Sequence, residues 1–135
     1  MPLPQQKLRE IVFQVLYCKD FGCNDMGGVF AIIGPLFKVS KRAVKEAIER
    51  VGEIALHLQE IDGFIAKNSK EYSFDRITGI EKNILRLGVY ELLYDQRIPK
   101  MGAIKEAVRL CRKFGTRDSA HFINAILDAI YHAKK

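Results

Sequence analysis

The chain has 135 residues, 48% of them hydrophobic, which predicts one folded domain with a sizeable core and excludes a disordered chain. Its 22 lysines and arginines outnumber its 16 aspartates and glutamates, and the formal net charge of +6 favours a polyanionic partner. No apolar run approaches the length of about 18 residues that a transmembrane helix needs. The start, Met1–Pro4, lacks the basic and apolar regions of a secretory signal. We therefore expect a cytoplasmic protein without a disulfide among Cys18, Cys23 and Cys111.

Residues 6 to 19 are predicted to form the first helix. Its apolar residues recur at helical spacing and form one stripe: Leu8, Ile11, Val12, Val15 and Leu16. Phe13 and Tyr17 are four residues apart and point away from this stripe, with Lys7 and Arg9 beside them. Either these rings pack under another helix of the chain, or they form a surface for RNA or a partner.

The segment from residue 20 to 40 has the weakest pattern. Asn24 or Asp25 is a candidate cap for a short helix, which Gly34 and Pro35 should end. Six apolar residues there are expected to join the core: Val29, Phe30, Ile32, Ile33, Leu36 and Phe37.

Ser40 is placed to cap a long helix that begins at about Lys41. Its apolar stripe continues to Ile61, and Asp62-Gly63 is expected to break it or to start a new helix. A polar connection should follow.

In that connection, residues 67 to 75, Tyr72 and Phe74 are expected to anchor the chain to the core. Thr78 and Glu81 then match a capping box, in which a Thr oxygen and a Glu carboxylate satisfy exposed backbone N–H groups. A new helix is predicted to begin directly after Thr78.

This helix, expected to end near Tyr94, is apolar on almost every side. A helix that is apolar all round is buried, so the remaining helices should wrap it. Gly88 lowers helix propensity and is expected to mark a close approach of another element. Glu81, Arg86 and Glu91 are its polar exceptions.

Two further helices are predicted, from about residue 100 to 113 and from a cap at Asp118 or Ser119 to Ile130. Pro99 should prevent helix in the link before them. The chain has no alternating apolar pattern of strand length. The predicted fold class is therefore all-α, a bundle of six or seven helices.

The sequence contains no pattern of a catalytic or metal site. It has no phosphate-binding glycine loop and no nucleophile elbow, and its three histidines lack metal-ligand spacing. Cys18 and Cys111 lie on amphipathic helices, where packing is the expected role. We therefore expect a protein that is not an enzyme and has no cofactor.

Positive charge gathers near the C-terminal helices. The cluster consists of Lys105, Arg109, Arg112, Lys113 and Arg117. A solvated helix face is the ordinary explanation of such a cluster. Here, however, Phe114 lies inside the basic run and Phe122 follows in the next helix. Cations hold phosphates and aromatic rings stack on unpaired bases, so the combination favours single-stranded RNA.

Several strings then occur in a fixed order: LREIVFQVLY, ILRLGVYELLY, IP, AIKEAVRLCRKFG, DS and FINAILD. They resemble the NusB family of bacterial transcription antitermination factors and cover about two thirds of the chain. The resemblance implies a single NusB-like domain, residues 1–135, built from two packed three-helix subdomains, roughly residues 1–75 and 76–135.

The same resemblance implies binding of the single-stranded boxA element of ribosomal RNA leader transcripts. The partner it implies is NusE, a ribosomal protein that also contacts RNA polymerase. The RNA-binding positions it implies are Lys7, Arg9, Gln14, Tyr17, Phe114, Asp118 and Phe122, which would meet on one surface if the chain folds like its relatives. Glu81 and Arg86 would lie near the NusE surface. Asp118 either accepts a hydrogen bond from a base or serves only as a helix cap.

The chain departs from the family at its start. Many relatives begin with several consecutive arginines, whereas this chain has only Lys7 and Arg9 there. Fewer phosphate contacts weaken RNA binding and its salt dependence, and Arg112 and Arg117 are candidates to compensate. A protein-interaction scaffold with weakened RNA binding is the alternative function.

Two further interpretations follow from the family. Some RNA methyltransferases carry a NusB-like domain, but the 135 residues contain no methyltransferase domain. Some family members dimerise, and Phe13 and Tyr17 are candidates for such a contact.

Overall fold

The computed structural model describes residues 5–20, 22, 28, 31, 34–35, 38, 40–95 and 98–133. Every regular element in these ranges is a helix, as predicted, and none is long and apolar enough to cross a membrane. The chain divides into two compact units, Met1–Leu56 and His57–Lys135. Several predictions fall outside the described residues: the caps Asn24 and Asp25, the thiol of Cys23, and the six apolar residues from Val29 to Phe37 that were expected in the core.

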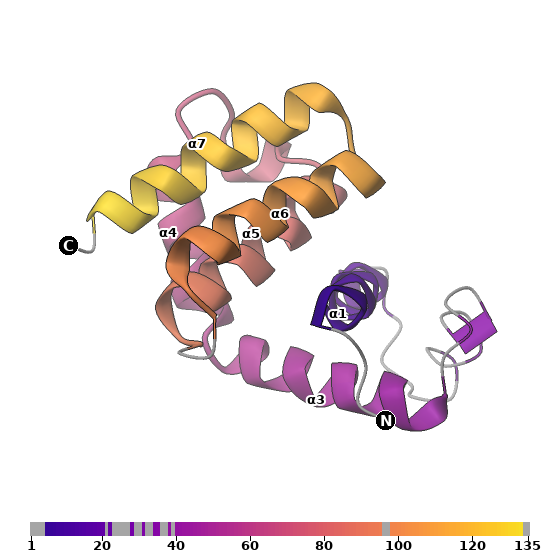
Figure 1. Ribbon diagram of the computed structural model, residues 1–135. Coiled ribbons are helices and arrows are strands. Elements are labelled where there is room, and N and C mark those ends of the chain that lie inside the picture. The colour runs from indigo at the N-terminus through magenta and orange to yellow at the C-terminus, as the bar shows by residue number, and fades with distance from the viewer. Residues whose placement is uncertain are drawn as a thin grey trace. The chain divides into compact units, whose positions relative to one another are not determined.

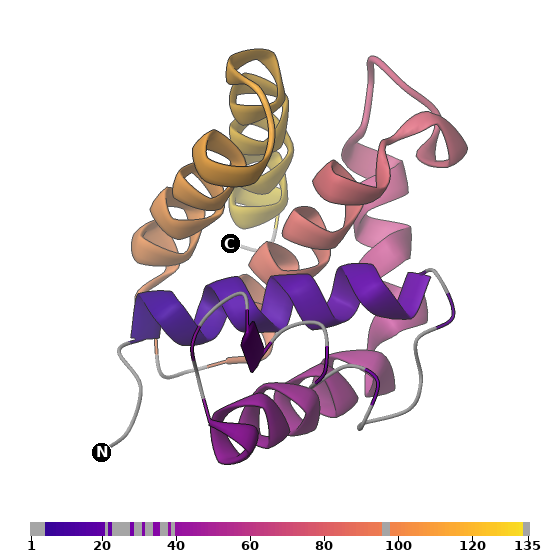
Figure 2. The same ribbon diagram turned by 90° about the vertical axis from the view of Figure 1, so that its right-hand side faces the viewer.

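In the first unit, α1 (Gln5–Asp20) and α3 (Lys41–Leu56) lie side by side (Figures 1 and 2). The predicted cap of α3 is confirmed, because the backbone N–H of Ala43 donates to Ser40 Oγ at 3.2 Å. The predicted stripe of α1 is buried, and Phe13 is buried with it, as the packing alternative requires.

The helix after α3 shows that the predicted break is wrong. α4 (Leu58–Asn68) continues through Asp62 and Gly63, and the interruption lies at His57, with φ −113° and ψ 11°. There the imidazole of His57 stacks on the ring of Tyr94, with centroids 4.1 Å apart. This contact joins residues far apart in the sequence, so local pattern did not predict it.

The position of α4 also moves the division between the two units. The expected division lies near residue 75, whereas contacts divide the chain between α3 and α4. The reason is that α4 packs against α5 (Gly79–Leu93) and α7 (Arg117–Ala133) and buries Ile61 and Ile65.

α5 is the central helix of the second unit. It packs against α4, α6 (Lys100–Phe114) and α7, and the short 3-10 helix η1 (Phe74–Arg76) precedes it. Nine of its residues are buried, which confirms the prediction of a buried helix. Its capping box is also confirmed, since Thr78 Oγ1 accepts from the N–H of Glu81 at 3.2 Å and Glu81 Oε1 accepts from the N–H of Thr78 at 3.3 Å.

Gly88 lies where α5 meets its neighbours most closely. A Cβ built on Gly88 would stand 2.9 Å from Leu127 Cδ1 and 3.5 Å from the Cβ of Ala107. The predicted close approach is therefore confirmed, and it lets α6 and α7 lie side by side over α5 (Figure 1).

Candidate nucleic-acid interface

Two grooves flank α7 in the second unit. The first, which we call the aromatic groove, has a volume of about 640 Å³ and is lined by residues of α7 and of the connection after α4. Its lining includes Lys70, Glu71, Tyr72, Asp118, His121 and Phe122. The rings of Tyr72 and Phe122 meet edge to face, with centroids 5.4 Å apart. Because Tyr72 is 47% exposed and Phe122 is only half-buried, aromatic surface remains open to a ligand.

The second groove runs between α6 and α7 and has a volume of about 900 Å³. We call it the cationic groove, because its lining includes Lys105, Arg112 and Arg117, all of which are exposed. The structure therefore groups Asp118 with Phe122, and Arg112 with Arg117, on the two sides of one helix. His121 lines both grooves.

The start of α7 shows whether Asp118 serves as a helix cap. Thr116 is the cap of this helix, since its Oγ1 accepts from the N–H of Ser119 at 3.1 Å. The predicted cap at Asp118 or Ser119 is therefore wrong, because the helix begins earlier, at Arg117. Asp118 lies exposed in the first turn, where a carboxylate is available to a ligand.

Phe114, the last residue of α6, is half-buried and belongs to neither groove lining. The ammonium of Lys113 lies 5.8 Å from the centre of its ring, a cation–π contact. A backbone hydrogen bond ends the helix after Phe114: the N–H of Gly115 donates to the carbonyl of Cys111 at 2.7 Å. Burial, together with the charge of Glu81, raises the pKa of the Cys111 thiol.

The remaining predicted RNA residues lie in the first unit, on α1. Lys7, Gln14 and Tyr17 are half-buried, and the rings of Phe13 and Tyr17 stack with centroids 6.0 Å apart. Arg9 is only 8% exposed, so its substitution would disturb packing as well as charge. That these residues share a surface with those of the second unit stays a prediction.

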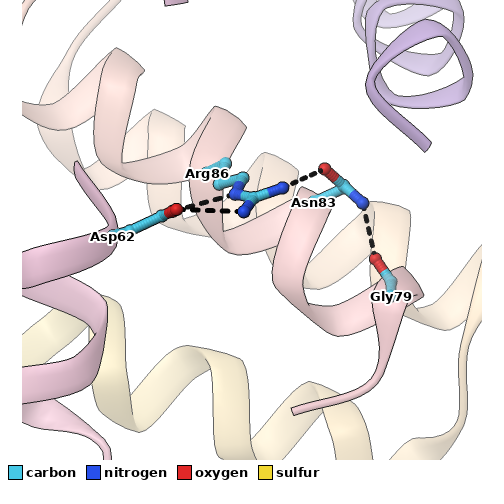
Figure 3. A network of polar contacts seen from close by, with 4 residues as sticks. All are labelled: Asp62, Gly79, Asn83 and Arg86. Carbon is cyan, nitrogen blue, oxygen red and sulfur yellow. Dashed lines mark hydrogen bonds and ion pairs between the residues drawn. The ribbon is translucent and has the colours of Figure 1, made fainter. Parts of the chain in front are cut away.

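Glu81 and Arg86, the predicted partner residues, both make contacts inside the second unit. Glu81 belongs to the capping box of α5. The guanidinium of Arg86 donates to both carboxylate oxygens of Asp62, at 2.8 and 2.9 Å, and to Asn83 Oδ1 at 3.1 Å (Figure 3). Asn83 in turn donates to the carbonyl of Gly79 at 2.8 Å. These contacts give both residues a structural role.

Comparison with known proteins now identifies the family. The NusB family profile matches residues 6–132. This chain belongs to the NusB family. The transcription antitermination protein NusB of Geobacter sp. (strain M21) is 40% identical over 130 residues, which cover 90% of each chain.

Solved structures of NusB proteins have the same fold. NusB of T. maritima is 30% identical and superposes with a TM-score of 0.81 over 98% of this chain and 93% of its own. NusB in a complex of the antitermination factors NusB and NusE with double-stranded RNA is 31% identical, with a TM-score of 0.79 over 96% of each chain. The predicted family and the all-α fold are therefore confirmed.

Sequence reasoning missed two residues that line these grooves, Tyr72 and His121. Tyr72 was expected to anchor the connection to the core, but it is exposed and packs on Phe122, because the connection returns over α7. The place of His121 in the groove lining was not predicted, because this residue was considered only as a metal ligand. In the described part of the chain, no three His, Cys, Asp or Glu side chains are placed to hold a metal ion.

Proposed function

We propose that this NusB-family protein binds single-stranded boxA RNA together with NusE and acts in transcription antitermination. The observation that carries this proposal is the aromatic groove, in which Tyr72 and Phe122 present partly exposed rings beside Asp118. Unpaired bases stack on such rings, and a carboxylate accepts hydrogen bonds from base amino groups. The NusB–NusE–RNA complex among the similar structures supports RNA and NusE as partners.

Cations supply the second part of the proposed interaction. Lys7 and Arg9 lie on α1, and Arg112 and Arg117 are exposed in the second unit. We infer that these side chains contact phosphates, which attract the strand without reading its sequence. The edge-to-face rings and Asp118 would then supply the preference for particular bases.

The proposal is tested by fluorescence anisotropy with labelled boxA RNA and a scrambled RNA at low salt, with and without NusE. We expect boxA to bind more tightly than the scrambled strand and NusE to strengthen the binding. The same boxA sequence annealed to its complement should bind less well, because paired bases cannot enter the aromatic groove. If neither the protein nor its mixture with NusE prefers boxA, RNA recognition is refuted and the scaffold function takes its place.

Two substitutions test the groove itself. Phe122→Ala should weaken boxA binding by about 1–3 kcal/mol with little change in salt dependence, because stacking is not ionic. Asp118→Asn removes a negative charge and should leave binding equal or tighter. Phe122 also contacts Tyr72, so thermal melting of Phe122→Ala must show a folded protein at the assay temperature. An unchanged affinity of a folded Phe122→Ala protein would contradict stacking in this groove.

For NusE, Glu81 and Arg86 remain the predicted contacts. Both residues also stabilise the second unit, so their loss would act on NusE binding partly through structure. A pull-down with NusE is therefore informative only beside a melting curve of the same variant.

A further inference from the structure

The cationic groove has a chemistry that the aromatic groove lacks. Lys105 and Arg112 lie seven residues apart on α6, which places them about 10.5 Å apart along the helix axis. Arg117, at the start of α7, adds a third exposed cation. No aspartate or glutamate is found among the described residues that line this groove, whereas Glu71 and Asp118 line the other. Among the described residues, none forms an ion pair with these three cations.

The floor of this groove is unsuited to base stacking. Ile104 and Ala120 are buried, and Val108 is half-buried. Within the described part of the lining, the imidazole of His121 is the only ring. Three exposed cations beside aliphatic lining residues suit a chain of phosphates, which needs positive charge but no aromatic surface.

The two grooves adjoin at the N-terminal half of α7. His121 lines both of them, and Arg117 in one precedes Asp118 in the other. A strand whose bases lie in the aromatic groove therefore needs only to cross the first turns of α7 to reach the three cations. These adjoining grooves favour RNA over an acidic protein segment, because RNA carries both bases for the aromatic groove and phosphates for the cationic groove.

We propose that the cationic groove binds the sugar–phosphate backbone of the RNA beyond the nucleotides held in the aromatic groove. The inference rests on the proposed RNA binding and extends its footprint along α6. Lys105, Arg112 and Arg117 then act on affinity and salt dependence, and they do not discriminate between sequences. Each phosphate contact to a single strand contributes about 0.7 to the slope of log affinity against log salt.

The test compares a boxA-like hexamer with a dodecamer that extends it, bound to the full chain at several salt concentrations. The groove variant is Lys105→Gln/Arg112→Gln. The matched control is Lys67→Gln/Arg42→Gln, which removes the same two charge types from exposed helix positions outside both grooves. All four positions are exposed, so both variants are expected to fold, and thermal melting checks this.

We expect the dodecamer to bind wild-type protein more tightly and with a steeper salt slope than the hexamer. The groove variant should lose this gain, with a slope on the dodecamer lower by about 1.4 for two contacts, and it should weaken hexamer binding less than dodecamer binding. The control should keep the gain. Equal binding of the two lengths by wild-type protein, or an equal loss in the control, would refute the inference.

Two further outcomes are distinct. If neither length binds at low salt, the proposed function itself fails. A glutamate-rich dodecapeptide is measured alongside the RNA. If it binds more tightly than the RNA dodecamer and the groove variant abolishes that binding, the groove is a protein site and the RNA inference is overturned.

Discussion

Arg86 on α5 holds Asp62 on α4 through two parallel hydrogen bonds, Nε to Oδ1 at 2.8 Å and Nη2 to Oδ2 at 2.9 Å. The side chains are only 11% and 24% exposed, so little water screens the pair. The geometry is bidentate, which is the strongest arrangement between arginine and a carboxylate. This pair joins two helices whose contact moves the unit boundary away from the expected position.

Removing one partner of this pair should destabilise the second unit. We expect Asp62→Ala to lower the free energy of unfolding by about 1–3 kcal/mol, because it removes the carboxylate that accepts two hydrogen bonds from a half-buried guanidinium. Urea denaturation of Asp62→Ala, Arg86→Ala and the double variant measures the coupling between them. Strictly additive losses would show that the pair contributes nothing of its own.

Two glycine-to-alanine substitutions are predicted to change stability in opposite directions, because Gly88 is closely packed and Gly63 is not. Gly88→Ala should lower stability by about 1–3 kcal/mol, because the added methyl group would lie 2.9 Å from a terminal carbon of buried Leu127. Gly63→Ala, at an exposed position of α4 with no atom within 4 Å of the added carbon, should instead stabilise by up to about 1 kcal/mol. Chemical denaturation compares the two. A stabilised Gly88→Ala protein would contradict the packing of α7 on α5.

We expect the ionisation of Tyr94 to lower the free energy of unfolding in the alkaline range. Burial, then the hydrogen bond to the Glu60 carboxylate and its negative charge, raise the pKa of Tyr94 from 10.0 to about 12. The unfolded chain ionises first as pH rises, so the stabilisation is full below pH 10 and is lost between pH 10 and 12. Tyr94→Phe should flatten the fall in unfolding free energy over that window. Identical pH profiles of the two proteins would be inconsistent with the raised pKa.

The thiol of Cys111 is predicted to react slowly in the folded protein. Its side chain is fully buried, and burial raises its pKa, so little reactive thiolate is present near neutral pH. Cys18, which is half-buried on α1, should react sooner. Alkylation followed by peptide mass mapping reports each site separately, and denatured protein gives the reference rate. Fast labelling of Cys111 before unfolding would show that the end of α6 opens readily.

On α1, Lys7 and Arg9 should differ in what their loss does. Lys7→Gln should reduce the salt slope of RNA binding by about 0.7–1 and lower the melting temperature less than Arg9→Ala does, because Lys7 is the more exposed of the two residues. Arg9→Ala should lower both RNA affinity and thermal stability, since Arg9 is 8% exposed. Binding and melting curves of the two variants separate these effects. A Lys7→Gln protein with an unaltered slope would remove α1 from the phosphate contacts.

The sequence by itself determined the helices, most of their limits and the family. Ser40, Thr78 with Glu81, and Pro99 act on backbone groups a few residues away, so their effect can be predicted from spacing alone. The buried character of α5 could also be predicted, because a helix with apolar residues on every side must be covered.

Only the tertiary structure decided what depends on contacts between distant residues. At the helix break, the ring of His57 stacks on Tyr94, and further along α4 Asp62 pairs with Arg86. Both contacts join α4 to α5. The same is true of the candidate site, where Tyr72 meets Phe122 and the cations of α6 gather on the other side of α7. Helical periodicity assigns a residue to a face of its own helix. Which neighbour covers that face, and which part stays open as a groove, depends on how the helices pack.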